Sequence, residues 1–188
     1  MNESRPFRFG YQAARDLADM RGQARDAEAA GFDVISTWDH IGATISPLLP
    51  LLAIADATER IRVCPTVINN DLHHPVQLAM EFSDLDHLTG GRAELGIGAG
   101  HSFTEYEAIG IPFDPARVRK ERMAESIEVI RRLLTGESVT WDGTFYHLSD
   151  VTIRPSQQAR LPFFVGVNGS AALAHAAQHA DTIGLTML

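Results

Sequence analysis

The run Gly96-Ile97-Gly98-Ala99-Gly100-His101 carries the residue types best suited to hold a cofactor. It follows a strand-like stretch at residues 93–97, and a strand that ends in glycine lets another molecule approach its backbone. Glycine at positions 98 and 100 removes the side chains that would block a flat ring or a phosphate. We therefore predict a cofactor site at the end of this strand.

Composition limits the classes of partner. The chain has 188 residues, of which 45% are hydrophobic and 21% charged, and this favours a single domain with a substantial core. A net charge of −8 without a Lys/Arg run argues against nucleic acid or an anionic membrane as partner. Cys64 is the single cysteine, residues 1–10 lack the pattern of a signal peptide, and no apolar stretch reaches the ~20 residues of a membrane span. We expect a cytoplasmic protein.

Strand-like and helix-like patterns alternate along the chain. Helices are predicted from the apolar spacing that ends at Gly31, from a Ser46 cap with Pro47 in the first turn, from Pro75, from an Asp114-Pro115 cap to Gly136, and from Ser170 to about residue 179. Residues 139–148 predict a hairpin insertion with a two-residue Asp-Gly turn. The strands are predicted at residues 7–11, 32–38, 61–68, 93–97, 161–167 and 181–187.

Two architectures fit repeated β/α units: an open doubly wound sheet and a closed (β/α)8 barrel. The glycine run lacks the third glycine of the dinucleotide fingerprint, and a charged helix occupies the place of its acidic residue. Polar residues instead gather where strands end, as in a barrel. They are Trp38-Asp39-His40, Asn69-Asn70-Asp71, Gly100-His101 and Asn168-Gly169-Ser170.

Eight short motifs lie in a fixed order over nearly the whole chain. They are Gly31-Phe32-Asp33, Asp39-His40, Ala57-Thr58-Glu59-Arg60-Ile61-Arg62-Val63, His74-Pro75, Leu85-Asp86, Gly90-Gly91-Arg92, Gly96-Ile97-Gly98-Ala99-Gly100 and Glu105-Tyr106. This order resembles luciferase-like monooxygenases, most closely the branch that uses the deazaflavin coenzyme F-420. The resemblance implies an α/β fold, a (β/α)8 TIM barrel, here truncated after about six units, with residues 1–188 forming one domain that is incomplete at the C-terminus.

The resemblance also implies roles for individual residues. Asp39 and His40 would face the cofactor ring, with His40 moving a proton to or from a substrate oxygen and Asp39 orienting His40 or bonding the ring edge. A strand bulge with a cis peptide, backing the ring, maps onto Thr66-Val67, and Pro65 independently predicts irregular backbone there. The remaining cofactor contacts would come from Gly98, Ala99, Gly100, His101, Asn168, Gly169 and Ser170. Some sugar-phosphate dehydrogenases of the family carry a glutamate at the place of His101, so their substrate does not transfer.

Several other residues have simpler structural interpretations. We expect Cys64 in the core, Glu94 paired with Arg92 or Arg62, His73 in a solvent-facing loop and His74 at a helix start. The basic residues Arg117, Arg119 and Lys120 predict a solvated helix face, with contact to an acidic cofactor tail as the lesser alternative.

The sequence thus predicts an oxidoreductase that transfers a hydride between coenzyme F-420 and a small organic substrate. Three alternatives stay open: an FMN-dependent monooxygenase, a metal-dependent TIM-barrel hydrolase using the histidines near strand ends, and an inactive fragment. No metal ligand is assigned. A homodimer is also left open, because six strands cannot close an eight-stranded barrel and would leave two edges unpaired.

Overall fold

Parallel strands in two joined sheets form the inner layer of the computed structural model, which describes residues 7–14, 16–42, 45–167, 173, 176, 177 and 179–185. The first sheet contains β1 (Gly10–Gln12), β2 (Val34–Thr37) and β3 (Arg62–Pro65) in that order. The second sheet has the order β4 (Ile68–Asn69), β5 (Leu95–Gly98), β8 (Phe163–Val167) and β9 (Thr182–Leu185). A parallel bridge between Val63 and Ala93 joins the two sheets.

The third barrel strand is interrupted between β3 and β4. Val63 pairs with Ala93 and Ile68 pairs with Ile97. The two paired positions are thus five residues apart on this strand and four residues apart on its neighbour. The extra residue is a bulge, and the peptide bond between Thr66 and Val67 is cis. The bulge and the cis bond implied by the family resemblance are therefore both present.

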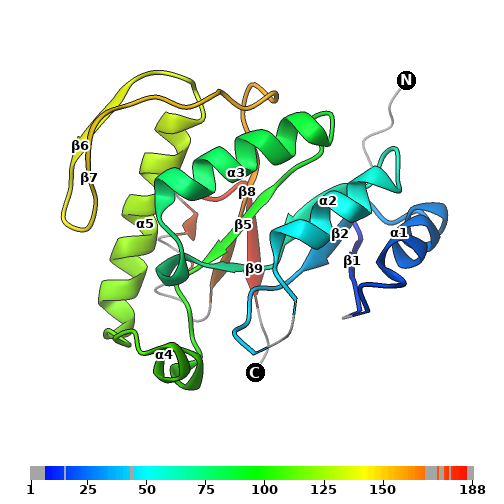
Figure 1. Cartoon of the computed structure of the whole chain (residues 1–188), viewed down its shortest axis with the longest axis horizontal. Helices are drawn as coiled ribbons and strands as arrows, with labels where there is room; N and C mark the ends of the chain where they lie inside the picture. The colour runs from blue at the N-terminus through cyan, green and yellow to red at the C-terminus, as the bar shows by residue number, and fades with distance from the viewer. Residues whose placement is uncertain are drawn as a thin grey trace.

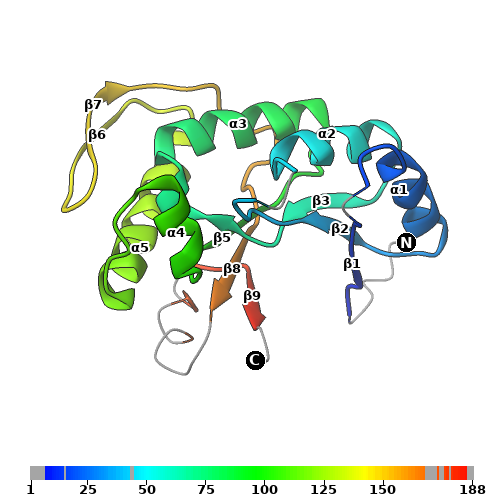
Figure 2. The same ribbon diagram turned by 60° about the horizontal axis from the view of Figure 1, so that its bottom comes forward.

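Helices cover the outer side of the strands. Figure 2 shows α1, α2 and α3 as one layer along the strands, while α5 and the β6–β7 hairpin lie beyond α3 (Figure 1). The helices are α1 (Met20–Ala29), α2 (Leu48–Asp56), α3 (Pro75–Leu88), α4 (Phe103–Ile109) and α5 (Ala116–Leu133), with a 3-10 turn at Asn70–Leu72. None of the helices in the described part of the chain is long and apolar enough to cross a membrane.

The core lies between the strands and this helical layer. Helix α5 buries Met123, Ile127 and Ile130 at spacings of four and three, as the sequence predicted. Strand residues such as Ile35, Leu95 and Val165 are fully buried beneath the helices. Among the described strands, β1 and β9 each pair on one side only.

Some predicted helix and strand ends are wrong. The first strand begins at Gly10, because Phe7 and Phe9 are exposed and lie outside the sheet. Ser46 does not cap α2, which begins after Pro47 without a side-chain cap. Asp114 does not cap α5 either, because its carboxylate is bound to Arg122.

The hairpin is present but its turn differs from the predicted one. β6 (Val139–Asp142) and β7 (His147–Val151) pair with Asp142 opposite His147, so the loop has four residues. The Glu125 carboxylate on α5 accepts hydrogen bonds from the N–H groups of Thr144 and Tyr146 at 3.0 and 2.9 Å. A Cβ at Gly143 would lie 2.0 Å from Glu125 Oε1. This glycine therefore admits a carboxylate from another element instead of a two-residue turn.

Candidate functional site

The carboxyl ends of the parallel strands bring the predicted residues together. Asp39 and His40 follow β2, Asn69 ends β4, and the run from Gly98 to His101 ends β5 and leads into α4. Because neighbouring parallel strands end at the same edge of a sheet, these segments meet on one side of the molecule. The order of the strands was enough to predict that these segments lie together.

Asp39 binds His73 in the structure. Asp39 Oδ2 lies 2.8 Å from His73 Nε2 and accepts a hydrogen bond from the Asn69 N–H at 3.1 Å. Both side chains are largely buried. Asp39 therefore does not orient His40, and His73 is not the solvent-facing loop residue that the sequence predicted.

His40 has a different carboxylate partner, Glu105 from the first turn of α4. His40 Nδ1 lies 2.8 Å from Glu105 Oε1, and the Ile41 N–H donates to Glu105 Oε2 at 3.2 Å. Burial by itself raises the pKa of Glu105, but hydrogen bonds from His40, the Ile41 N–H and Ser102 outweigh it and lower that pKa. The carboxylate is thus held in its ionised form beside the imidazole.

His101 lies next to this pair. The His40 and His101 rings have centroids 5.6 Å apart and meet edge to face at 84°. The segments that follow β2 and β5 thus bring two imidazoles side by side. This arrangement brings His101, a predicted cofactor contact, beside His40.

The space beside the glycines of β5 is filled by other residues of the protein. A Cβ at Gly96 would lie 1.7 Å from the Pro65 carbonyl oxygen, and one at Gly98 would lie 2.6 Å from Val67 Cγ2. Gly166 is the register partner of Gly98 on β8, and its Cβ would lie 3.0 Å from Val67 Cγ1. Val67, at the cis peptide, therefore occupies the space left by two paired glycines.

Gly100 is required by a buried polar cluster. Its φ of +72° is left-handed, and a Cβ there would lie 2.1 Å from the Tyr106 hydroxyl. That hydroxyl shares its proton between Asp71 Oδ2 at 3.0 Å and Asn69 Oδ1 at 3.1 Å. Burial, together with the charge of Asp71, raises the pKa of Tyr106 to about 12. The cluster ties α4 to the end of β4.

Arg119 does not lie on a solvated helix face, which corrects the sequence-based expectation for this residue. The side chain is buried and donates to the carbonyl oxygens of Ala99 at 3.2 Å, Gly100 at 3.3 Å and Asp114. Its guanidinium also lies 3.9 Å from the centre of the Phe113 ring. Arg119 thus holds the glycine run in place from α5, and its position on the helix gave no sign of this. Arg117 is exposed, as predicted.

The other structural interpretations are mostly confirmed. Cys64 is buried, and burial raises the pKa of its thiol. Glu94 pairs with Arg62 and with Arg8, while Arg92 binds backbone carbonyls instead. His74 opens α3, where its Nδ1 accepts from the Val76 N–H.

Three predicted cofactor residues, Asn168, Gly169 and Ser170, lie outside the described residues, as does most of the helix predicted from Ser170. The cofactor contacts predicted for Thr66, Val67 and the glycine run stay predictions. Within the described ranges, no three His, Cys, Asp or Glu side chains gather so that they could hold a metal ion. Of the histidines near the strand ends, His40 and His73 are bound to carboxylates, His74 caps α3, and His101 contacts the His40 ring.

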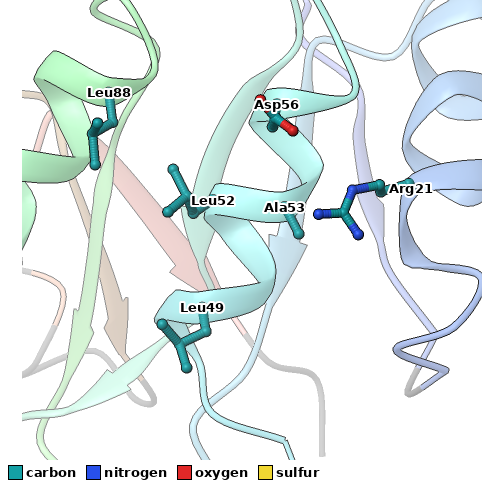
Figure 3. Close-up of a pocket in the computed structure, with 6 residues that line it drawn as sticks. All are labelled: Arg21, Leu49, Leu52, Ala53, Asp56 and Leu88. Atoms are coloured by element: carbon teal, nitrogen blue, oxygen red, sulfur yellow. The ribbon is translucent and has the colours of Figure 1, made fainter.

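A hollow of about 380 Å³ lies away from the strand ends. It is lined by side chains from α1, α2 and the end of α3 (Figure 3), namely Arg21, Leu49, Leu52, Ala53, Asp56 and Leu88. It belongs to the outer helical layer and contains none of the predicted site residues. We therefore place the candidate site at the strand ends around His40.

Comparison with known proteins decides the family. The family model described as luciferase-like monooxygenase matches residues 4–188. The chain belongs to the luciferase-like monooxygenase family. The chain therefore has a luciferase-like fold, with barrel strands, a bulge after β3 and a candidate site at the strand ends.

Curated relatives of this luciferase-like chain include both dehydrogenases and monooxygenases. An F-420-dependent glucose-6-phosphate dehydrogenase of Beutenbergia cavernae is 35% identical over 176 residues, covering 88% of the chain and 52% of the relative. A 4-hydroxyprotoasukamycin monooxygenase of Streptomyces nodosus subsp. asukaensis is 42% identical over 127 residues, covering 66% and 33%. The chain thus spans about half the length of the first dehydrogenase relatives it matches.

Solved structures show the same fold. The coenzyme F-420-dependent tetrahydromethanopterin reductase of Methanopyrus kandleri has a TM-score of 0.85 at 24% identity, covering 95% of this chain and 55% of the reductase chain. An F-420-dependent secondary alcohol dehydrogenase in complex with an F-420–acetone adduct has a TM-score of 0.86 at 22% identity, covering 95% and 57%. These likenesses establish that the chain has the luciferase-like TIM-barrel architecture over its described strands.

Proposed function

We propose that this protein is an oxidoreductase that transfers a hydride between coenzyme F-420 and a small organic substrate. The observation that carries the proposal is the pair of His40 and Glu105 at the strand ends, where an imidazole fixed by a carboxylate can move the proton that accompanies a hydride. Dehydrogenases named for F-420 among the relatives support the choice of cofactor. We propose an alcohol or its carbonyl product as the substrate class, because loss of a hydride from carbon and a proton from oxygen interconverts these two groups.

The residues present fit a flat, ring-bearing cofactor. Gly98 and Gly166 leave no side chain of their own near the ends of β5 and β8, and the half-buried Val67 side chain lies against both of them. We propose that Val67 supports the ring, and that the backbone of Ala99 and Gly100, held by Arg119, lines its edge. When bound, a deazaflavin supplies a centre that accepts or donates a hydride.

The chain's own groups handle the proton. In oxidation of an alcohol, the substrate loses a hydride from carbon and a proton from oxygen, and His40 is placed to take that proton. Asp39 is occupied by His73 and the Asn69 N–H, so its role is to hold the segment after β2 against β4. His101 lies at the rim beside His40, and we propose that it contacts the substrate.

A second candidate is an FMN-dependent monooxygenase. The monooxygenase of Streptomyces nodosus has a higher identity, 42%, than the dehydrogenases, although over a shorter stretch. The two functions differ in the ring that binds and in whether oxygen is consumed.

Titration of the protein with each cofactor tests the proposal. We expect saturable binding of F-420, followed by its fluorescence anisotropy, and turnover of a panel of small alcohols followed by loss of F-420 absorbance at its oxidised band. Gly10→Ala is the matched control, since this strand glycine also lacks a left-handed φ and a Cβ there would meet only the Val34 carbonyl oxygen, at 3.8 Å. Gly98→Ala should weaken binding by displacing Val67. Saturable binding of FMN alone, with oxygen uptake, would replace the proposal with the monooxygenase.

Three other properties are proposals: an incomplete domain, a homodimer and a cytoplasmic location. We propose that residues 1–188 form one domain that lacks part of an eight-stranded barrel, and a longer form that binds cofactor when the 188-residue form does not would support the fragment alternative. The homodimer and the cytoplasmic location stay predictions of the sequence.

A further inference from the structure

Two carboxylate–imidazole pairs lie next to each other at the strand ends, and they differ in access. In the Asp39–His73 pair the side chains are 8% and 20% exposed. In the Glu105–His40 pair the imidazole is 36% exposed and its carboxylate 15%. A substrate can therefore reach His40, while Glu105 stays behind it.

Glu105 contacts both the ring and the backbone next to it. One carboxylate oxygen bonds His40 Nδ1 and the other accepts from the Ile41 N–H. These two contacts fix the His40 side chain relative to its own main chain. Since an ionised carboxylate can only accept hydrogen bonds, the hydrogen between them must belong to Nδ1 of His40.

The other ring nitrogen of His40, Nε2, is available to accept a proton. Within the described part of the chain, Nε2 of His40 makes no hydrogen bond, and the edge-to-face contact with His101 leaves the imidazole at the rim. In a neutral ring whose Nδ1 carries the hydrogen, Nε2 has a free lone pair. That nitrogen can then accept a proton.

Helix α4 is held rigidly enough to set this geometry. Tyr106, directly after Glu105, is fully buried and bonds Asn69 and Asp71, so the seven-residue helix cannot rotate without breaking that cluster. Glu105 is therefore anchored through its neighbour to β4. A surface glutamate of a free helix would not be placed in this way.

We propose that Glu105 is a positioning residue, which fixes the Nδ1–H tautomer of His40 and makes Nε2 the atom that takes the substrate proton. The tautomer is a property of the protein alone, and the catalytic consequence rests on the proposed function. Adjacency in the chain favours Asp39, which stands next to His40, whereas Glu105 lies 65 positions away.

The tautomer can be measured by long-range ¹H–¹⁵N NMR on protein labelled with ¹⁵N-histidine, at a pH where the ring is neutral. His40 is assigned by the loss of its signals in His40→Gln. We expect the Nδ1–H pattern in the wild type and a mixture of tautomers in Glu105→Gln, because a glutamine amide can donate as well as accept. Glu105→Asp, which keeps a carboxylate, should restore part of the Nδ1–H form.

Glu125→Gln is the matched control. Glu125 has a pKa lowered in the same direction by hydrogen bonds, but its contacts are with the hairpin loop and not with a histidine. This variant should leave the His40 spectrum unchanged. An Nε2–H form in the wild type, or an unchanged Nδ1–H form in Glu105→Gln, would overturn the proposal.

Kinetics test the catalytic part separately. In Glu105→Gln we expect kcat to fall about 10²-fold, the lower end for loss of general acid–base assistance, with KM and cofactor affinity changed less than about twofold. A wild type that binds and turns over no F-420 would refute the proposed function while the NMR result still decides the tautomer. Full kcat in a variant with a mixed tautomer would remove Glu105 from the mechanism.

Discussion

Glycine at position 100 can be required by its backbone conformation or by the close approach of the Tyr106 hydroxyl. Comparison of Gly100→Ala with Gly110→Ala separates these two reasons. Both residues have left-handed backbone, with φ of +72° and +73°. A Cβ at Gly110 meets nothing within 4 Å, whereas one at Gly100 would lie 2.1 Å from the Tyr106 hydroxyl and 2.6 Å from Asn69 Oδ1. The two substitutions therefore share the backbone strain and differ only in the collision.

The size of the difference follows from the contacts. A left-handed alanine costs about 1 kcal/mol at either site. At Gly100 the Tyr106 hydroxyl must also move away from Asp71 and Asn69, and a hydrogen bond to a charged group contributes roughly 1.5–3 kcal/mol. We expect Gly110→Ala to lower the free energy of unfolding by about 1 kcal/mol and Gly100→Ala by about 3–4 kcal/mol.

Urea unfolding followed by circular dichroism measures both values, provided that the slope with denaturant is unchanged. Tyr106→Phe in the Gly100→Ala background removes the hydroxyl and should recover part of the collision cost. Equal destabilisation by the two alanines would refute the assignment of Gly100 to the Tyr106 cluster. The glycine would then serve the backbone conformation alone.

Two further predictions concern α5. Arg119→Met should lower the free energy of unfolding by about 3 kcal/mol, since its three contacts with backbone carbonyls are lost. Arg117 is exposed, so Arg117→Met should change that free energy by less than about 0.5 kcal/mol. Equal effects of the two substitutions in urea unfolding would contradict the buried role of Arg119. For Glu125, burial raises the pKa, but hydrogen bonds from the hairpin loop outweigh it and lower it below the unfolded value of 4.5. The contribution of ionised Glu125 to the free energy of unfolding is complete above pH 4.5 and is lost as the pH falls through the pKa of the folded state. Glu125→Gln should therefore flatten the decline of the free energy of unfolding below pH 4.5. The same decline in the variant and the wild type would argue against these hydrogen bonds.

Much of the fold could be predicted from local patterns. The alternation of apolar strands and amphipathic helices specified parallel β/α units, because each element must bury one face against its neighbours. Pro65 correctly marked irregular backbone, since proline cannot donate to the sheet. Helix α4 was missed, because its seven residues are too few to show a clear period and five of them are exposed.

Partners across the sheet were harder to predict. Asp39 is adjacent to His40 in the chain, yet it turns to His73, and the carboxylate beside His40 comes from α4. Arg119 looked like part of a charged helix face, but Phe113 and the loop after β5 cover it. Adjacent residues point in different directions, so sequence distance does not decide which side chains meet.

The sequence by itself determined the class of fold and the edge of the sheet at which polar residues, His40 among them, gather. These features depend on periodicity and strand order, which are local. Only the tertiary structure decided which carboxylate holds His40, and that the glycines of β5 admit Val67 and Tyr106. Such pairings depend on atoms brought within hydrogen-bond or van der Waals distance by packing of separate elements.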